Sequence, residues 1–391
     1  MYMLNIENYL PKKTEEAWKY TSLQEIKKID WKTADQEINL SHDELKLISV
    51  QLKSEFTNVV FVDGFYNKTL SDSDFKNLTV EKTTEKDFTV VDTDVENQLK
   101  SLLKAFAKEK IVIQIDQSLQ QPLQIIHVLS KKSSTIIQSM THVHIAKSCQ
   151  AKMIQSFISL NGQSQQLMNN EIHIFTAENS EIKFINNQNL SATDFIFSRI
   201  YAHAKNQTQI KTFEMALGGK ISRHNLNLYL EGEQAQTSIL GLSLLSDDQH
   251  CDHYTFIQHQ KGHNESFQHY KSILADKSRS VFRGRVRIEQ DAQKANSAQL
   301  NNNLLLSRAA EADSVPQLEI YADDVKAGHG STVGQLNKDE VFYFLSRGIS
   351  EQDAIKMISY GYAKEIIYKL ENAELEKFAL DTLNTKLADI F

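Results

Sequence analysis

Cysteine is scarce in this sequence: only Cys149 and Cys251 occur among 391 residues. Two cysteines cannot build a disulfide framework, and their scarcity favours a reducing compartment. They also fall short of the three or four thiolates with which a single chain holds an iron–sulfur cluster. Cys149 stands alone in its stretch of sequence, so we expect it to be a buried structural thiol.

Several other features are missing. No apolar run reaches transmembrane length, and residues 1–10 lack the order of a signal peptide, so we expect a cytoplasmic protein that does not bind membranes. The net charge is −7 without a dense basic run, which argues against nucleic acid as a main partner. No G-x-x-x-x-G-K-[ST] loop and no G-x-G-x-x-G occur, so ATP hydrolysis would have to come from a partner.

Proline is rare too, with three residues in all beside 13 glycines, which favours long regular elements. Residues 1–110 have a mixed, mostly helical pattern. Ser41 and Glu44 form a capping-box pattern, and residues 61–65 predict a strand, a tight turn and a second strand. Leu99, Leu102, Leu103 and Phe106 fall on one helical face.

Residues 111–335 alternate mostly between apolar and polar positions, which predicts strands. Short polar units begin at residues 146, 177, 204 and 231, and a further unit occupies 289–293. This spacing of roughly 30 residues is typical of stacked solenoid coils. We therefore favour a parallel β-helix with two or three strands per coil, and a β-sandwich is the alternative.

Residues 336–391 return to a helical pattern. The pattern predicts a short helix over 338–347 that Gly348 ends, and a second helix that Ser350 caps. The apolar face of this second helix consists of Ile355, Ile358, Tyr362 and Ile366. It could either cap the end of the solenoid or dock a partner, and the two uses are compatible.

The sequence resembles the SufB/SufD family of iron–sulfur cluster assembly scaffolds, most densely over its last third. The residues that carry the resemblance are QHYKSIL (268–274), SVFRG (280–284), DAQ (291–293), NNNLLL (301–306), PQLEIYADDVK (316–326), HGSTVG (329–334) and FYFLSRGI (342–349), with EAWKYT (16–21) near the N-terminus. SufB-like cysteines are missing, so the SufD-type branch of the family is the better match.

The resemblance implies a mainly β protein, with a right-handed parallel β-helix between an N-terminal and a C-terminal helical region. It implies a non-catalytic scaffold that pairs with a SufB-like paralogue through the β-helices and carries a SufC-like ABC ATPase on the C-terminal helices. The chain alone would bind no cofactor. A nascent Fe–S cluster, and any flavin, would belong to the assembled complex, and self-pairing into a homodimer stays open.

His329 is the first candidate site residue, because Gly328 and Gly330 let the backbone pass close to a neighbour. Imidazole can replace thiolate on iron. The resemblance implies that His329 faces the SufB-like partner and helps to form the cluster site, and an ordinary interface hydrogen bond is the alternative. Many family members have cysteine two positions earlier, where this chain has Ala327. Either that cysteine is dispensable, or the site is built mainly from the SufB-like partner with His329 as this chain's sole ligand, which fits the low cysteine count better.

The remaining candidates are weaker. His250, Cys251, His253, His259, His263 and His269 form a dense group, but no second cysteine pair completes a zinc site, and on a strand Cys251 and His253 would lie opposite His250. Arg283, Arg285 and Arg287 would share one strand face and pair with Glu289 or a partner, or simply face solvent. A β-helix polysaccharide lyase is disfavoured, because the only tempting acidic pair is Asp323 and Asp324, and adjacent strand positions point to opposite faces.

Overall fold

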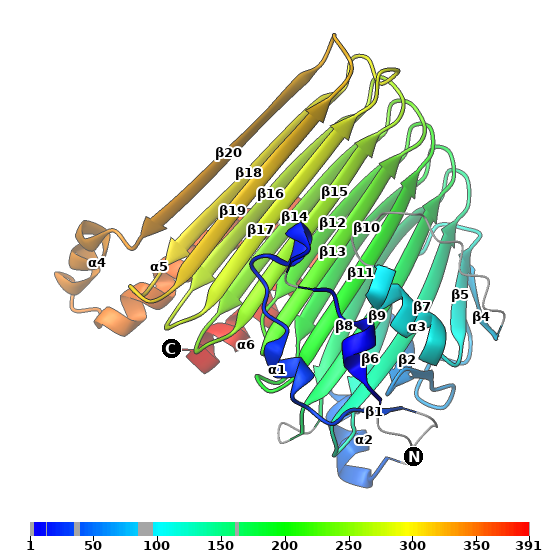
Figure 1. Ribbon diagram of the computed structural model, residues 1–391, viewed down its shortest axis with the longest axis horizontal. Helices are drawn as coiled ribbons and strands as arrows, with labels where there is room; N and C mark the ends of the chain where they lie inside the picture. Colours follow the sequence, from blue (N-terminus) through cyan, green and yellow to red (C-terminus); the bar gives the residue numbers. More distant parts are fainter. Residues whose placement is uncertain (1–3, 13, 35–39, 85–96, 161–163, 391) are drawn as a thin grey trace.

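The computed structural model describes residues 4–12, 14–34, 40–84, 97–160 and 164–390. Residues 1–3, which belong to the 1–10 segment without signal-peptide order, therefore lie outside the described residues. The described chain is mainly β, with helices near both ends (Figure 1). In this part of the chain no helix is both long and apolar enough to cross a membrane.

Two ten-stranded sheets form the body of the molecule, and successive strands alternate between them. All neighbours from β5 onward pair in parallel, so each coil supplies one strand to each sheet. This confirms the parallel β-helix and excludes the β-sandwich, whose strands would pair antiparallel. The odd-numbered sheet contains β5 (Lys110–Ile115), β7 (Thr135–Ile145), β9 (Gln166–Thr176), β11 (Phe195–Ala204), β13 (Ile221–Leu230), β15 (His250–His259), β17 (Arg279–Ile288) and β19 (Glu311–Ile320). The even-numbered sheet contains β6 (Leu123–Leu129), β8 (Gln150–Ser159), β10 (Glu181–Asn189), β12 (Gln209–Ala216), β14 (Gln236–Leu245), β16 (Glu265–Leu274), β18 (Asn296–Leu305) and β20 (Lys326–Gln335).

The polar units in the sequence are the turns between an odd strand and the next even strand. Each of the first four contains a residue in the left-handed region, with φ of 58° to 60° at Ser148, Asn179, Gln207 and Gln234. In the first three turns the amide of this residue bonds to a carbonyl of the next turn, as in the 3.1 Å bond from Ser148 to Glu178. A polar residue occupies this position in all four turns, but its identity varies, so the units share character rather than letters.

The N-terminal region contains both strands and short helices. As predicted, Ser41 and Glu44 form a capping box on α2 (His42–Ser49), and β2 (Thr57–Val62) and β3 (Phe65–Tyr66) form a hairpin. β2 pairs with β6 and β4 (Leu78–Thr83) pairs with β5, so this region extends both sheets. The remaining elements are η1 (Ile6–Tyr9), η2 (Glu16–Trp18), α1 (Gln24–Lys27), β1 (Lys32–Thr33) and α3 (Asn97–Phe106).

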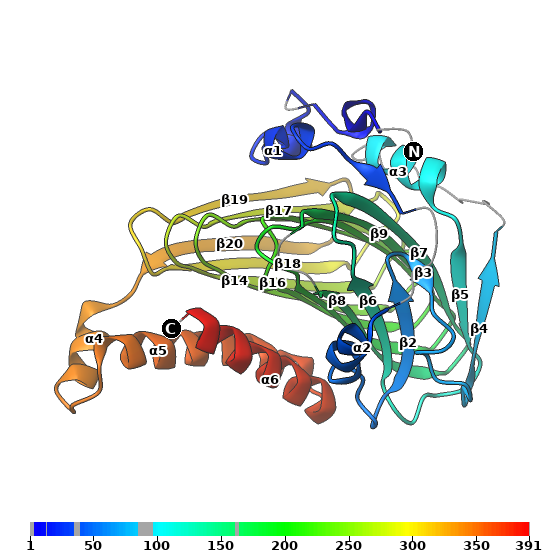
Figure 2. The ribbon, with the colours of Figure 1, turned by 90° about the horizontal axis from the view of Figure 1, so that it is seen from below.

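The two sheets are covered on opposite sides of the molecule, as Figure 2 shows. Trp18, Trp31 and Leu102 from the N-terminal elements pack on Phe195 and Phe197 of the odd sheet. On the other side, α5 (Glu351–Ile367) and α6 (Ala373–Ile390) pack on β12 and β14. The shorter α4 (Lys338–Leu345) precedes α5, and η3 (Tyr368–Leu370) connects α5 to α6. The lumen between the sheets has an aliphatic core of its own.

The C-terminal helices begin and end as the sequence predicts. Gly348, with φ +78°, follows α4, and the Ser350 side chain accepts a 3.1 Å hydrogen bond from the amide of Asp353 at the start of α5. The helices lie along the outer face of the even sheet rather than over the end of the solenoid (Figure 2).

Candidate functional site

The last coil of the β-helix has two open edges. β19 pairs only with β17 and β20 only with β18 among the described strands, and Figure 1 shows β20 at the border of its sheet. No residue of β20 is buried. A Cβ added at Gly328 or Gly334 would meet nothing within 4 Å. β20 is thus a flat edge with little side-chain bulk, which is a template for pairing with another strand.

His329 lies in this edge strand, in register with Gln299 of β18. Its neighbour Ala327 packs against the lumen core, so His329, two residues later on the strand, projects from the same side. The imidazole is exposed. No group of three His, Cys, Asp or Glu side chains in the described chain could hold a metal ion. Any cluster held at His329 would need its further ligands from another chain.

A groove of about 380 Å³ lies where the strand ends meet α4 and α5. Leu305, Leu336 and Ile355 line it together with Phe342 and Leu345 of α4. Phe342 is 69% exposed, and Tyr343 beside it is 55% exposed. Singly exposed apolar residues are normal, but a contiguous apolar patch of this kind is typical of an interaction surface.

The predicted apolar face of α5 is divided between this groove and the protein core. Ile355 lines the groove, while Ile366 is fully buried against the even sheet. Tyr362 lies under Lys271, whose Nζ is 4.1 Å from the ring centroid and donates to the Tyr362 carbonyl. Ile358 is half-buried. The C-terminal part of this face, with Tyr362 and Ile366, therefore holds α5 on the even sheet.

The histidine-rich segment does not form one site. As predicted, Cys251 and His253 share one face of β15 and point into the lumen, while His250 lies on the other face, 2.9 Å from the Thr21 hydroxyl. Cys251 Sγ is 3.4 Å from His253 Nε2, and Glu214 Oε2 is 3.5 Å from His253 Nδ1. Burial opposes charge on the imidazole, but Cys251 and the Glu214 carboxylate outweigh it and raise the pKa of His253. His259, His263 and His269 lie apart from this pair.

The arginine row and the acidic pair are engaged in surface contacts. Arg287 pairs with Glu289 at 2.7 Å, which was one of the alternatives to a solvated face, and Arg285 pairs with Glu319 at 2.7 Å. Arg283 is buried instead and donates to the backbone carbonyl of Glu16. Asp324 pairs with Lys294, and Asp323 is exposed. The two aspartates thus lack the facing arrangement that glycoside chemistry needs.

Sequence reasoning missed the role of residues 16–21, which fasten the N-terminal segment to the odd sheet. Trp18 is fully buried, with the Arg223 guanidinium 4.1 Å above its ring. Arg223 in turn pairs with Asp252, which accepts a hydrogen bond from Thr21. Both Arg223 and Asp252 stand in stretches that the sequence predicts as strands, but their pairing across adjacent strands needs the coil register.

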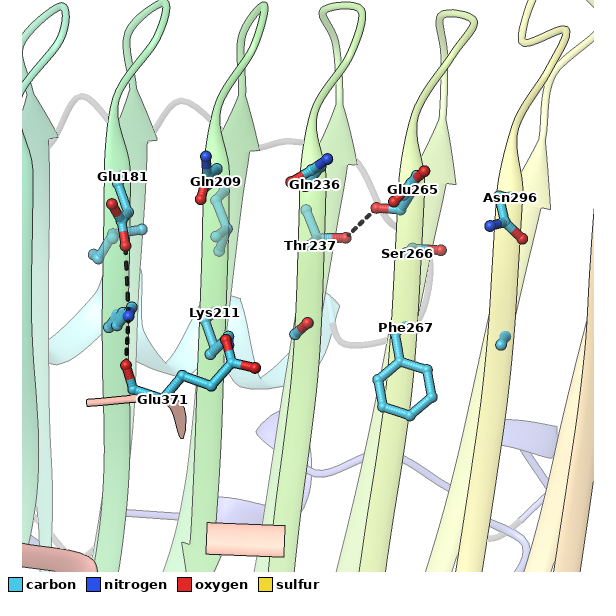
Figure 3. A pocket seen from close by; sticks show the side chains of 15 residues that line it. Glu181, Gln209, Lys211, Gln236, Thr237, Glu265, Ser266, Phe267, Asn296 and Glu371 are labelled. Carbon is cyan, nitrogen blue, oxygen red and sulfur yellow. Dashed lines mark hydrogen bonds and ion pairs between the residues drawn. The ribbon is translucent and has the colours of Figure 1, made fainter. Parts of the chain in front are cut away.

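A second groove, of about 370 Å³, crosses the outer face of the even sheet (Figure 3). Glu371, at the start of the last helical segment, reaches over it and accepts a 2.6 Å hydrogen bond from Lys211. Its backbone carbonyl accepts a bond from Lys183. These lysines and Glu371 are therefore partners of each other, and we assign this groove the structural role of holding the helices in place.

Known proteins resemble this chain over nearly its whole length. Residues 127–362, more than half of the chain, match the SUF system FeS cluster assembly SufBD core domain. The iron–sulfur cluster assembly protein SufD of Escherichia coli K12 is 31% identical over 97% of this chain and 89% of its own length. The SufBD family protein slr0076 of Synechocystis is 30% identical over 94% of this chain and 85% of its own, and SufD of Bacillus subtilis is 25% identical over 79% and 70%. The chain therefore belongs to the SufB/SufD family of iron–sulfur cluster assembly proteins, as a SufD-type member.

Proposed function

We propose that this chain is a non-catalytic, cytoplasmic scaffold subunit that pairs with a SufB-like paralogue and a SufC-like ABC ATPase while an iron–sulfur cluster is assembled. The cluster is its cargo rather than its own cofactor. The observation that carries the proposal is the open, exposed edge of β20 with His329 on it. A second β-helix can add its own edge strand there through backbone hydrogen bonds, which would bring its ligands next to His329.

The ATPase would dock on the groove between α4, α5 and the strand ends. Phe342, Tyr343 and Leu345 give this surface its apolar character, and Glu351 adds charge. Because α5 also packs on the even sheet, a pull on these helices would reach the β-helix through Ile366 and Lys271. ATP-driven movement of the two β-helices against each other would then open the shared site at His329.

The test of the cluster site is co-purification of the chain with its SufB-like and SufC-like partners, comparing wild type with His329→Ala. Cluster content is measured by absorbance. His42→Ala is the matched control, since His42 is an exposed histidine at the far end of the molecule. We expect the complex to form with the wild type and with both variants, and cluster content to fall only in His329→Ala. Unchanged cluster content in that variant would reduce His329 to an interface residue.

The test of ATPase docking is the variant Phe342→Asp. Deletion from Ser350 onward is a less specific test, because it also uncovers the buried leucines of β14. We expect Phe342→Asp to lose the ATPase while it keeps the SufB-like partner. Leu47→Asp on α2 changes another exposed apolar residue, and we expect this variant to keep both partners. ATPase retention by Phe342→Asp would overturn the docking proposal. Recovery of a stable dimer of this chain alone would instead identify the β20 edge as a self-pairing surface.

A further inference from the structure

A third groove, of about 590 Å³, lies on the outer face of the even sheet between the N-terminal region and α6. β6, β8 and β10 form its floor, residues 50–56 after α2 form one wall, and α6 forms the other. Figure 2 shows α2 and α6 on the same side of this sheet. The groove lies toward the end of the sheet opposite β20 (Figure 1), apart from His329 and from the groove at α4. A volume of this size suits a small organic ligand, since such sites usually measure about 300–1,000 Å³.

The floor of this groove is polar, whereas the sheet beside it is apolar. Ile154 of β8 and Ile185 of β10 pack under the C-terminal helices. Two residues further along the same strands stand Ser156 and Asn187, which are in direct register and so about 4.8 Å apart. Gln124 is on the adjacent strand β6, opposite Ile154. The three polar side chains therefore span two strand spacings, about 10 Å.

Each of these side chains has a buried polar atom without a hydrogen-bond partner among the described residues: Gln124 Oε1, Ser156 Oγ and Asn187 Oδ1. The three residues are only 2%, 4% and 5% exposed, respectively. Gln124 Nε2 donates a 3.3 Å hydrogen bond to the carbonyl of Gln51, which leaves Oε1 as the free acceptor of this side chain. Buried polar atoms without a partner are rare, because each costs more than a typical hydrogen bond contributes. Three of them on the floor of one groove point to a ligand that completes them.

The walls of the groove supply apolar surface, and its rim has no excess of either charge. The rings of Phe56 and Phe378, one from each wall, have centroids 6.5 Å apart. Ile126 adds aliphatic surface on the floor. Glu374 lines the groove as well but pairs with Lys152. The remaining charged residues are exposed and balance in sign: Lys53 and Lys377 with Glu55 and Asp381. The groove therefore suits an uncharged ligand.

Free hydrogen-bond acceptors outweigh free donors in the groove. Gln124 Oε1 and Asn187 Oδ1 can only accept. Thr382 and Thr385 of α6 donate their hydroxyl protons to carbonyls of the same helix, at 2.8 and 3.1 Å, so lone pairs remain on their oxygens. A ligand that satisfies the floor must bring O–H or N–H groups, and a ligand that fits the walls must bring an apolar ring.

We propose that this groove binds an uncharged small molecule that has an aromatic ring and at least one O–H or N–H donor. The ring packs on Phe56 and Phe378, in the offset or edge-to-face arrangement that aromatic pairs prefer. The donor bonds to Gln124 or Asn187. This inference does not depend on the role in cluster assembly, because it rests on the groove between β6, β8, β10 and α6 alone.

The test compares two probes that differ in one hydrogen-bond donor. Indole has an aromatic ring and one N–H, and in 1-methylindole a methyl group replaces that hydrogen. Each is titrated into the full ¹⁵N-labelled chain, with the side-chain amide signals of Gln124 and Asn187 followed by NMR. We expect indole to shift both signals and to bind at least fivefold more tightly than 1-methylindole, because only indole pairs with the buried acceptors. Equal affinities, or no shift of either amide with indole at about 5 mM, would overturn the proposal.

Two variants separate the polar floor from the apolar wall. Asn187→Leu removes an acceptor, and we expect it to weaken indole binding at least fivefold and to leave 1-methylindole binding unchanged. Phe378→Ala should weaken the binding of both probes. Asn384→Leu is the matched control, since Asn384 is an exposed residue of α6 that does not line the groove. Binding of indole to Asn187→Leu with the wild-type affinity would show that the floor does not select the ligand and would overturn the assignment.

Discussion

The two outer faces of the β-helix are covered in different ways. On the odd sheet the N-terminal segment combines apolar packing with directional contacts: the Arg223–Asp252 ion pair, the Thr21 hydroxyl and the guanidinium over Trp18. On the even sheet α5 and α6 are held by aliphatic packing, with Leu240 and Leu242 of β14 against Ile366 and Leu383. Ionic contacts there, such as the pair of the buried Lys271 with the exposed Glu365, are fewer than the apolar ones.

The difference indicates which face can tolerate movement. Aliphatic packing is non-directional, so helices can shift over a leucine surface at small cost as long as area stays buried. A buried ion pair with a fixed hydrogen bond permits one geometry, because separation leaves a charge without a partner in low dielectric. We therefore expect the N-terminal segment to be fixed and the C-terminal helices to be the mobile cover, in keeping with a docking role for an ATPase.

The largest expected effect is that of Arg223→Met. Arg223 and Asp252 are each about 1% exposed on their side chains, so among the described residues the variant leaves the buried carboxylate with the Thr21 hydroxyl as its hydrogen-bond partner. Loss of one partner of a buried pair costs about 3–5 kcal/mol. The free energy of unfolding from urea titration measures it. The double variant Arg223→Met with Asp252→Leu should regain most of the loss, and a double variant as unstable as the single one would mean that packing of the arginine, not its charge, fastens this face.

Leu383→Ala should have the next largest effect. Leu383 is fully buried between α6 and the even sheet, and truncation of such a leucine costs about 2–5 kcal/mol. Because the loss is spread over a shape-tolerant surface, we expect a value toward the lower end, with α6 more accessible to proteolysis while the β-helix remains folded. If α6 and the β-helix unfold at the same urea concentration, the C-terminal helices are coupled to the β-helix as rigidly as the N-terminal segment is.

The sequence contained part of this comparison. The inward–outward alternation of β15 was readable, and it placed Cys251 and His253 opposite His250 before any coordinates. Residues 239–245 contain five apolar side chains nearly in succession, which is typical of a strand buried on both faces, so a cover over β14 was implied. Which element supplies that cover could not be read, because both terminal regions offer apolar helices.

The lumen contains a buried histidine that burial keeps neutral, and the pH dependence of stability tests this. His127 stacks between Phe61 and Phe157 with ring centroids 4.7 and 4.9 Å away, and burial lowers its pKa to about 3. The unfolded chain titrates this group near 6.5, so only the unfolded state gains its proton as the pH falls below that value. The stability from a neutral His127 is complete above about pH 6.5 and is lost progressively down to about pH 3. We expect His127→Phe to lose less stability than wild type between pH 7.5 and 5.0, by about 1.4 kcal/mol for each pH unit below 6.5. Parallel losses in the two proteins would contradict a neutral buried imidazole.

The smallest expected effect belongs to the exposed part of the odd face. Arg285 makes two hydrogen bonds to Glu319, of 2.7 and 3.0 Å, but both side chains are about one-third exposed. Water and salt screen such a pair, and exposed pairs contribute about 0–1 kcal/mol even with good geometry. Arg285→Met should therefore change the free energy of unfolding by less than 1 kcal/mol, with the difference vanishing in high salt, whereas Arg223→Met should keep its effect there. Arg285 and Arg223 are both arginines in the odd sheet, each paired with an acid on the adjacent strand. A loss at Arg285 as large as that at Arg223 would mean that register, and not burial, makes the N-terminal cover rigid.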